Sequence, residues 1–234
     1  EAGKIGVKAH LAFMKAVAVN VKEKNLASLF QYVCKKEDAQ EIAYTTIIMS
    51  AENMPYGHYN RYNRTFKEGD FIILDAGPSY KYYVVDISTS MPANGKFTPK
   101  QKELYELANG IREVCIKNFK PGLTLGEVGQ NVKQYLTDNG FDPNDKRFSG
   151  YIRLAGYNHS IGMAVHDGMG TFKGTNEVLK EGFVFACDIM TGDDLEIGIR
   201  LEDTVLITQD GCDVLSAGLP RTVKEVESAM RNNK

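Results

Sequence analysis

The first part of the chain combines helical and strand-like spacing of apolar residues. Residues 3–22 predict an amphipathic helix, because apolar side chains recur there at near-helical spacing: Ile5, Ala9, Phe13, Val17 and Ala18. A second helix is predicted over residues 25–36. Residues 43–50 have the apolar and β-branched character of a strand, whereas residues 54–70, rich in Asn, Gly and Tyr, predict a loop.

Two apolar segments then flank a tight connection at residues 78–81. They read FIILDAG (residues 71–77) and YYVVDISTS (residues 82–90), which predicts a β-hairpin. A two-residue turn at Tyr80 and Lys81 would place Asp75 directly opposite Asp86. Directly opposed residues share a face of the sheet, with Cβ atoms roughly 4.5–5.5 Å apart.

The second part repeats the order of helices followed by strands. Thr98 and Gln101 form a capping-box pattern that opens a helix to about residue 119, and Thr124 and Glu127 open another that ends at Asn139. Beyond these come four predicted strands and a last helix, over residues 162–167, 182–190, 197–208, 212–216 and 222–231. This order predicts an α+β fold in which two similar α/β halves share one sheet.

Acidic side chains interrupt the apolar strands. Asp188 and Glu202 flank a turn-rich segment, and they lie opposite each other if partner numbers sum to 390. The acids inside that segment, Asp193, Asp194 and Glu196, are expected to be solvated turn residues. Together with Asp75 and Asp86, this gives four carboxylates on core-like strands, which would be costly to bury without positive charge among them. A pair of divalent cations is the simplest solution.

Two histidines lie in a single glycine-containing segment, HSIGMAVHD, at His159 and His166. A neutral imidazole at His159 suits metal ligation, and His166 suits a hydrogen-bond donor to a reacting oxygen. A set of four carboxylates and one imidazole fits Mn, Co or Zn better than copper or an iron–sulfur cluster.

Bulk composition removes other classes of function. The chain has 234 residues, and 43% of them are hydrophobic, which is enough apolar content for a full core. Its net charge is -2. The sequence contains no Lys/Arg cluster of the kind that binds nucleic acid or an anionic membrane. No apolar run is long enough to span a bilayer. Four dispersed cysteines without a CxxC pattern favour a reduced, cytoplasmic setting. The chain opens without Met, which is compatible with a fragment or a trimmed form.

Five motifs in this order resemble the creatinase/aminopeptidase family, which has the pita-bread fold. They are GDFIILDAG, YYVVDISTSMPANGKFTPKQKELYELA, NHSIGMAVHD, LKEGFVFACDIM and GIRLEDTVLIT. The ending VHD and the lack of an HGIP-like segment favour the Xaa-Pro peptidase branch, of aminopeptidases or dipeptidases. The resemblance implies a curved antiparallel sheet and a single catalytic domain over residues 1–234 without the N-terminal domain of longer relatives. It also implies a homodimer, because dimers are common among relatives.

The resemblance also implies roles for individual residues. Asp75 would bind one of two divalent metals, with manganese expected and Co or Zn as alternatives. Asp86 and Glu202 would bridge both ions, and His159 and Asp188 would complete the shell of the other. His58 and His166 match the two substrate-side histidines, and Arg200 would support Glu202 from beside it. His58 as a plain loop residue and Arg200 as a surface strand residue remain the alternatives, while His10 is expected to be structural.

On this basis the chain is expected to hydrolyse the N-terminal Xaa-Pro bond of peptides through a water activated by two metals, with Asp188 moving the proton. Three residue differences from the family's usual motifs argue against carrying its activity over unchanged. Asp188 replaces the usual Glu, Ile-Ser-Thr-Ser follows Asp86, and Asn158 precedes His159. The alternatives are a catalytically impaired pita-bread protein that binds peptides, a methionine aminopeptidase-like enzyme, and a metal-free creatinase-like hydrolase.

Overall fold

A computed structural model describes residues 1–145, 148, 155–168, 176–192 and 198–231. Its main sheet is antiparallel, with strand order β2-β3-β6-β9-β8-β7, and β10 also pairs with β9. Its strands are β2 (Ile47–Ser50), β3 (Phe71–Asp75), β6 (Ser88–Pro92), β7 (His159–Ser160), β8 (Val184–Gly192), β9 (Gly198–Ile207) and β10 (Cys212–Val214). A smaller sheet joins β1 (Glu41–Ile42), β4 (Pro78–Tyr80) and β5 (Tyr83–Val84).

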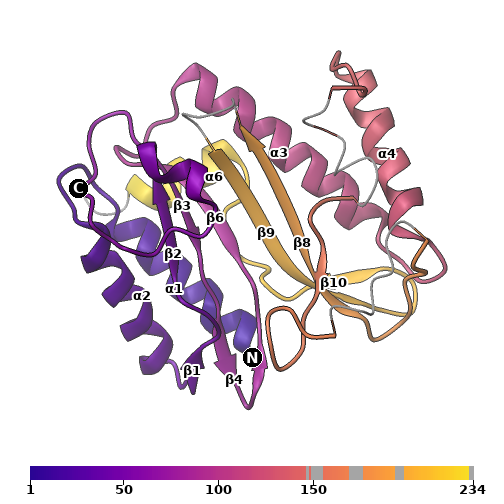
Figure 1. Ribbon diagram of the computed structural model, residues 1–234, viewed down its shortest axis with the longest axis horizontal. Helices are drawn as coiled ribbons and strands as arrows, with labels where there is room; N and C mark the ends of the chain where they lie inside the picture. Colours follow the sequence, from indigo (N-terminus) through magenta and orange to yellow (C-terminus); the bar gives the residue numbers. More distant parts are fainter. Residues whose placement is uncertain (146–147, 149–154, 169–175, 193–197, 232–234) are drawn as a thin grey trace.

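Two groups of helices accompany the curved sheet (Figure 1). Helices α1 (Ala2–Ala16) and α2 (Glu23–Lys36) lie beside the early strands, α3 (Pro99–Asn118) lies beside β8 and β9, and α4 (Leu125–Asp138) packs against α3. Helix α6 (Val223–Arg231) and the 3₁₀ helix η1 (Ala51–Tyr56) complete the described elements. The predicted α+β architecture with two helix-plus-strand halves is confirmed. None of the described helices combines the length and hydrophobicity needed to cross a bilayer.

Strand periodicity sorts side chains between the two faces of the sheet. On β3, Ile72 and Leu74 join the main core under the helices, whereas Ile73 and Asp75 point to the other face. On β9, Leu201 joins the same core while Glu202 points away from it. The period of two therefore gathers the acidic residues on the face opposite the helices.

Both predicted capping boxes are present and fix where the long helices begin. The Thr98 hydroxyl accepts a hydrogen bond from the Gln101 backbone N–H at 3.2 Å, and the Gln101 side chain accepts one from the Thr98 N–H at 2.9 Å. Thr124 and Glu127 make the same reciprocal pair at the start of α4. These bonds satisfy N–H groups that a helix start otherwise leaves without partners.

The first hairpin differs from the predicted register by two residues. Its turn lies at Lys81 and Tyr82, which adopt φ values of 49° and 71°, so Asp75 pairs with Ser88 and not with Asp86. Positive φ at both central residues is the geometry of a two-residue type I′ turn, which matches the twist of the flanking strands. Because a slip of two keeps the face of every side chain, Asp75 and Asp86 still reach each other's neighbourhood. In the second hairpin Asp188 does pair with Glu202, as predicted.

Three predicted boundaries were wrong. Helix α1 ends at Ala16, because the chain after it pairs with a distant segment: the Asn20 N–H donates to the Phe66 carbonyl at 2.9 Å. The strand predicted over residues 43–50 occupies only β2, and the strand predicted over residues 162–167 is a turn. In that turn the Asp167 carboxylate accepts a hydrogen bond from the Met163 N–H at 2.8 Å. The predicted turn acids Asp193, Asp194 and Glu196 lie outside the described residues.

Candidate metal centre

The four predicted acids meet on the open face of the sheet, each carried by a different segment. Asp75 ends β3, Asp86 lies between β5 and β6, and Asp188 and Glu202 face each other across β8 and β9. All four are buried, with Glu202 fully so. Four buried carboxylates in one place require positive charge or protons to offset them.

His159 completes a compact trio with two of these acids. Its Nε2 atom lies 3.6 Å from Asp86 Oδ2 and 3.6 Å from Glu202 Oε1, and one ligand-type atom from each residue lies within 4.8 Å of the others. Strand β7 sets this position, because His159 pairs with Ala186 two residues before Asp188. Among the described residues, this is the group whose geometry could hold a metal ion.

Unsatisfied atoms in the trio test whether a cation fits. Glu202 Oε1 is buried and has no hydrogen-bond partner among the described residues, and it is the oxygen that faces His159. Its other oxygen, Oε2, accepts a hydrogen bond from the Ser88 hydroxyl at 2.8 Å. A buried carboxylate oxygen without a partner is costly, so a cation between Glu202, Asp86 and His159 would supply what this oxygen lacks. Two carboxylates and an imidazole are suitable ligands for Mn²⁺, Co²⁺ or Zn²⁺, so these three side chains could hold such an ion.

Tyr44 links Asp75 to Asp86. Its hydroxyl lies 2.6 Å from Asp75 Oδ1 and 2.5 Å from Asp86 Oδ1. A phenol has only one hydrogen, so it can donate to one of these carboxylates at a time. Burial and the negative charges of Asp75 and Asp86 raise the pKa of Tyr44 well above its ordinary value, which keeps the hydroxyl protonated. Nothing in the sequence separates Tyr44 from an ordinary strand-edge aromatic residue, and sequence reasoning missed it.

Arg200 is buried among the acids, which excludes the alternative of a surface strand residue. Its guanidinium donates to both oxygens of Asp188, from Nη2 to Oδ2 at 2.8 Å and from Nε to Oδ1 at 3.2 Å. Its Nη1 atom donates to Asp75 Oδ2. The nearest approach to Glu202 is longer, at 3.8 Å. Arg200 therefore binds two of the predicted metal ligands directly, instead of supporting Glu202 alone.

The pKa values of the acids and of His159 reflect their burial and the charges of neighbouring side chains, including Arg200. Burial and then the charge of Glu202 raise the pKa of Asp86 well above its ordinary value, and the same two causes raise the pKa of Asp188 to about 7. Burial would also raise the pKa of Glu202, but Arg200 and His159 outweigh it and lower that pKa. For His159 burial acts to lower the pKa, but Glu202 outweighs it and raises that pKa. The ionised form of Asp86 is thus disfavoured while no cation lies beside it, and a cation bound there would favour that form.

The two predicted substrate-side histidines lie at the mouth of the centre. The rings of His166 and His159 stack with centroids 4.0 Å apart and planes 13° from parallel. His166 and His58 are both exposed, and they line a cavity of about 230 Å³ together with Tyr44, Asp75, Asp86 and Arg200. His58 therefore faces the same space as the acids, unlike a loop residue remote from the site.

A second layer of buried polar residues supports these strands from the helix side. Asp203, next to Glu202, accepts hydrogen bonds from Arg221 at 2.6 Å and from Arg112 of α3. Arg221 also donates to the carbonyl oxygens of Ser88 and Glu202, at 2.8 Å each. Burial, opposed and outweighed by the two arginines, leaves the pKa of Asp203 lowered to about 2. The position of Asp203 directly after a candidate ligand was the one sequence signal for this layer.

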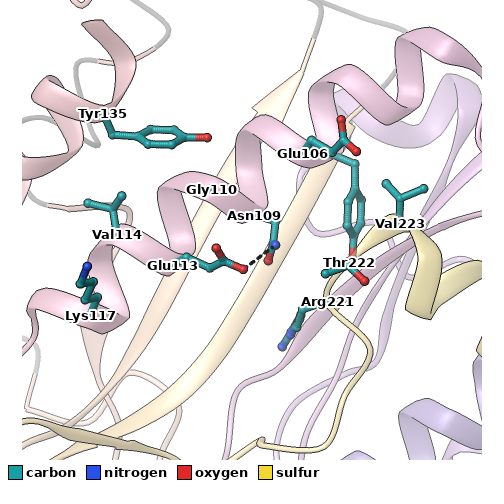
Figure 2. Close-up of a pocket in the computed structure, with 11 residues that line it drawn as sticks. Glu106, Asn109, Gly110, Glu113, Val114, Lys117, Tyr135, Arg221, Thr222 and Val223 are labelled. Carbon is teal, nitrogen blue, oxygen red and sulfur yellow. Dashed lines mark hydrogen bonds between the residues drawn. The ribbon is translucent and has the colours of Figure 1, made fainter. Parts of the chain in front are cut away.

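A separate cavity of about 410 Å³ lies between α3, α4 and the start of α6 (Figure 2). Figure 2 shows Asn109 and Glu113 joined on α3, through a hydrogen bond of 3.0 Å. None of the predicted site residues is among the described residues that line it. The cavity near the acids, although smaller, is the one that carries the chemistry.

Comparison with known proteins gives an independent view of the same residues. Residues 1–209 match metallopeptidase family M24. The mitochondrial intermediate cleaving peptidase 55 of Arabidopsis thaliana is 30% identical over 89% of this chain and 44% of its own length. Xaa-Pro aminopeptidase 3 of Rattus norvegicus is 30% identical over 97% of this chain and 48% of its own length. The chain thus spans about half the length of the curated relatives it matches.

Solved structures agree with the sequence matches. An aminopeptidase P of Escherichia coli, solved with substrate, superposes with a TM-score of 0.86 at 28% identity, over 98% of this chain and 56% of that one. A putative aminopeptidase P from Bacillus anthracis gives a TM-score of 0.87 at 31% identity, over 100% of this chain and 56% of that one. The predicted pita-bread fold and the resemblance to the Xaa-Pro peptidase branch are confirmed.

Proposed function

Because the chain belongs to metallopeptidase family M24, we propose that it hydrolyses the N-terminal Xaa-Pro bond of peptides with a metal-activated water. The observation that carries the proposal is the trio of Asp86, His159 and Glu202, with a buried carboxylate oxygen that lacks a partner. When bound there, divalent metal supplies Lewis acidity and lowers the pKa of a water molecule toward neutrality. The proline preference is carried over from the names of relatives such as Xaa-Pro aminopeptidase 3.

The chain's own side chains take distinct parts in this proposal. Asp86, Glu202 and His159 hold the metal, while Tyr44 keeps the carboxylates of Asp75 and Asp86 together. His166 stands over His159 at the mouth of the centre, where it can donate a hydrogen bond to the oxygen that becomes negative as the carbonyl is attacked. Asp188 as the carrier of the proton, and His58 as a contact to substrate, remain predictions.

The two-ion arrangement implied by the resemblance is part of the proposal. Asp75 would serve one ion, Asp188 would serve the ion that His159 binds, and both carboxylates accept hydrogen bonds from Arg200. Manganese as the physiological metal, a homodimer, a cytoplasmic location and a single catalytic domain over residues 1–234 also remain predictions.

Hydrolysis assays test the proposal directly. The purified chain, loaded with Mn²⁺, Co²⁺ or Zn²⁺, is incubated with an Xaa-Pro dipeptide and with a tripeptide that has proline second. We expect release of the first residue, and the preferred length distinguishes a dipeptidase from an aminopeptidase. Xaa-Ala peptides and a Met-Ala-Ser peptide serve as controls, and cleavage of the latter alone would favour a methionine aminopeptidase. No release from any proline peptide with any of these metals contradicts the proposal.

A second candidate function is a catalytically impaired protein that binds peptides. The contact that favours it is the two-point hydrogen bond from Arg200 to Asp188, which engages both oxygens of a predicted catalytic carboxylate. Peptide binding measured by calorimetry, without release of product by the metal-loaded chain, would support this candidate. A metal-free creatinase-like hydrolase is disfavoured, because the partnerless oxygen of Glu202 calls for a cation.

A further inference from the structure

A second cavity adjoins the one that holds the acids. It has a volume of about 470 Å³, and it shares two lining residues, His58 and Asn60, with the cavity of about 230 Å³ over the centre. Besides His58, its described lining consists of three asparagines, two tyrosines and Arg61. A polar hollow next to the metal centre is a candidate for holding the part of a substrate that does not react.

Hydrogen bonds to β2 fix the wall of this second cavity, which is formed by η1 and the loop that follows it. The Ile48 N–H donates to the Tyr59 carbonyl oxygen at 3.1 Å, and the Tyr62 hydroxyl donates to the carbonyl oxygen of Thr46. Strand β2 in turn pairs with β3, which carries Asp75. The loop therefore has a set position relative to the acids of the centre.

The loop carries two arginines with opposite surroundings. The Arg64 side chain is buried, and it forms ion pairs with Glu52 at 2.9 Å and with Asp70 at 2.8 Å. Arg61 is exposed, and none of the ion pairs among the described residues includes it. Among the described residues that line the second cavity, Arg61 alone carries a permanent charge. Arg64 thus holds the loop together, whereas the guanidinium of Arg61 is available to an anion.

Asn53 supplies a second hydrogen-bond donor to the same cavity. Only 7% of its surface is exposed, and its Nδ2 atom has no acceptor among the described residues. A buried amide N–H without an acceptor is costly, so a ligand oxygen there would be favourable. Because Arg61 and Nδ2 of Asn53 both donate, the complementary group is an acceptor with negative charge. A carboxylate meets this requirement with two oxygens.

The proposed reaction determines which part of a peptide would reach this cavity. A substrate that is cut after its first residue has only that residue on the amino side of the bond, and its ammonium group is attracted to the buried acids Asp75 and Asp86. The rest of the peptide must leave through the mouth, past His58 and His166. Since consecutive Cα atoms are about 3.8 Å apart and His58 lines both cavities, the residue after proline would enter the second one.

We propose that the second cavity binds the residue that follows proline, and that Arg61 and Asn53 give it a preference for a carboxylate at that residue. The carboxylate is either the side chain of an acidic third residue or the chain end of a tripeptide. Arg61 is thus a specificity-determining residue that takes no part in bond cleavage. This inference deepens the proposed function and rests on it for the direction in which the peptide lies.

Three peptides of equal length test the inference. Ala-Pro-Gln-amide is neutral at its third residue, Ala-Pro-Glu-amide adds a carboxylate on the side chain, and Ala-Pro-Gln with a free end carries one at the chain end. For the metal-loaded chain we expect kcat/KM to be about 5-fold higher for at least one of the two charged peptides, the upper range for an exposed ion pair. The difference should lie in KM, because the contact is the same before and during bond cleavage. It should shrink in about 0.5 M NaCl, because salt screens exposed charges.

Substitutions then assign the preference to Arg61. Arg61→Gln should remove it, and Arg61→Lys, which keeps the charge, should retain most of it. Arg61→Glu should reverse it, so that Ala-Pro-Lys-amide is cleaved faster than Ala-Pro-Glu-amide. Lys67→Gln removes a positive charge at an exposed position further along the same loop, outside both cavities; it is the matched control and should keep the preference.

The outcomes distinguish this inference from the proposed function. Equal kcat/KM for the three peptides, or a preference that Arg61→Gln leaves unchanged, would overturn the inference and leave the hydrolase proposal standing. If no peptide is cleaved, the proposed function fails, and dissociation constants measured by calorimetry for the same peptides replace the kinetic ratios. A preference in binding that Arg61→Gln removes would then still support the assignment of the cavity, whereas equal affinities or no binding would overturn it.

Discussion

His10 gives a quantitative prediction, because it is fully buried between α1 and the strands of the centre. Its Nε2 atom lies 2.9 Å from the carbonyl oxygen of Ala76, and its Nδ1 atom lies 2.9 Å from the Thr89 hydroxyl. A carbonyl only accepts hydrogen bonds, so Nε2 carries the hydrogen and Nδ1 accepts from Thr89 in the neutral ring. His10 therefore ties α1 to the residue after Asp75 and to the residue after Ser88.

Burial lowers the pKa of His10 from 6.5 to about 4, more strongly than any other influence on it. The neutral imidazole is thus favoured in the folded state, and unfolding allows the ring to take up a proton. This stability is present above pH 6.5 and is lost as the pH falls from 6.5 toward 4. A difference of about 2.5 pKa units corresponds to about 3 kcal/mol in full, of which about 2 kcal/mol is lost between pH 7 and pH 5.

Other groups titrate in the same range, so the prediction concerns a difference between two proteins. Asp86 and Asp188 have raised pKa values, and their protonation favours the folded state as the pH falls, which is the opposite sign. Comparing the chain with His10→Gln cancels these contributions. Glutamine keeps one donor and one acceptor but takes up no proton.

Urea unfolding in EDTA, at pH 7 and at pH 5, provides the assay. We expect the free energy of unfolding of the unmodified chain, relative to His10→Gln, to fall by about 2 kcal/mol between these pH values. His58→Gln, the same substitution at an exposed histidine, is the matched control and should show no such change. A difference between the chain and His10→Gln that stays constant would refute the assignment of His10 as a neutral buried link.

Three further predictions concern the centre and its frame. His159→Ala should weaken manganese binding by more than about 10-fold and abolish Xaa-Pro hydrolysis, as measured by dialysis and product release; unchanged metal affinity would exclude His159 as a ligand. Manganese at about 100 times its Kd should raise the free energy of unfolding by about 2.7 kcal/mol at pH 7. The same manganese concentration should raise it by less at pH 5, because burial and Glu202 raise the pKa of Asp86 and protons then compete with the metal. An equal increase at both pH values would contradict this competition. Gly77→Ala should destabilise the chain by about 3 kcal/mol in urea, because a Cβ atom there would lie 1.8 Å from the Val85 carbonyl oxygen, whereas Gly211→Ala, with open space around it, should cost far less.

The pairing of Asp188 with Glu202 was predicted by supposing one register across a long loop, with partner numbers that sum to 390, and the structure has that register. The predicted register of the first hairpin was wrong by two residues. The sequence does not decide between a turn at Tyr80–Lys81 and one at Lys81–Tyr82, because residue types only bias the backbone conformation on which that choice depends. Since the period of a strand is two, that slip still delivered Asp75 and Asp86 to one face. Patterns of this kind locate a site even where they misplace a turn.

What the sequence could not supply was the partnership of Arg200. Its position two residues before Glu202 predicts a shared face, but the choice of Asp188 over Glu202 as partner depends on side-chain reach within the folded sheet. The role of Tyr44 was not predicted for a related reason, because its contacts to Asp75 and Asp86 span 31 and 42 residues of sequence. Long-range polar contacts of single side chains leave no periodic trace in a sequence.

The most direct test of the metal centre is an anomalous diffraction map from crystals of the chain soaked in manganese. We predict a peak at bonding distance, roughly 2.0–2.3 Å, from oxygens of Asp86 and Glu202 and from a ring nitrogen of His159. A map without a peak among these three side chains, or with manganese bound only elsewhere, would contradict the account.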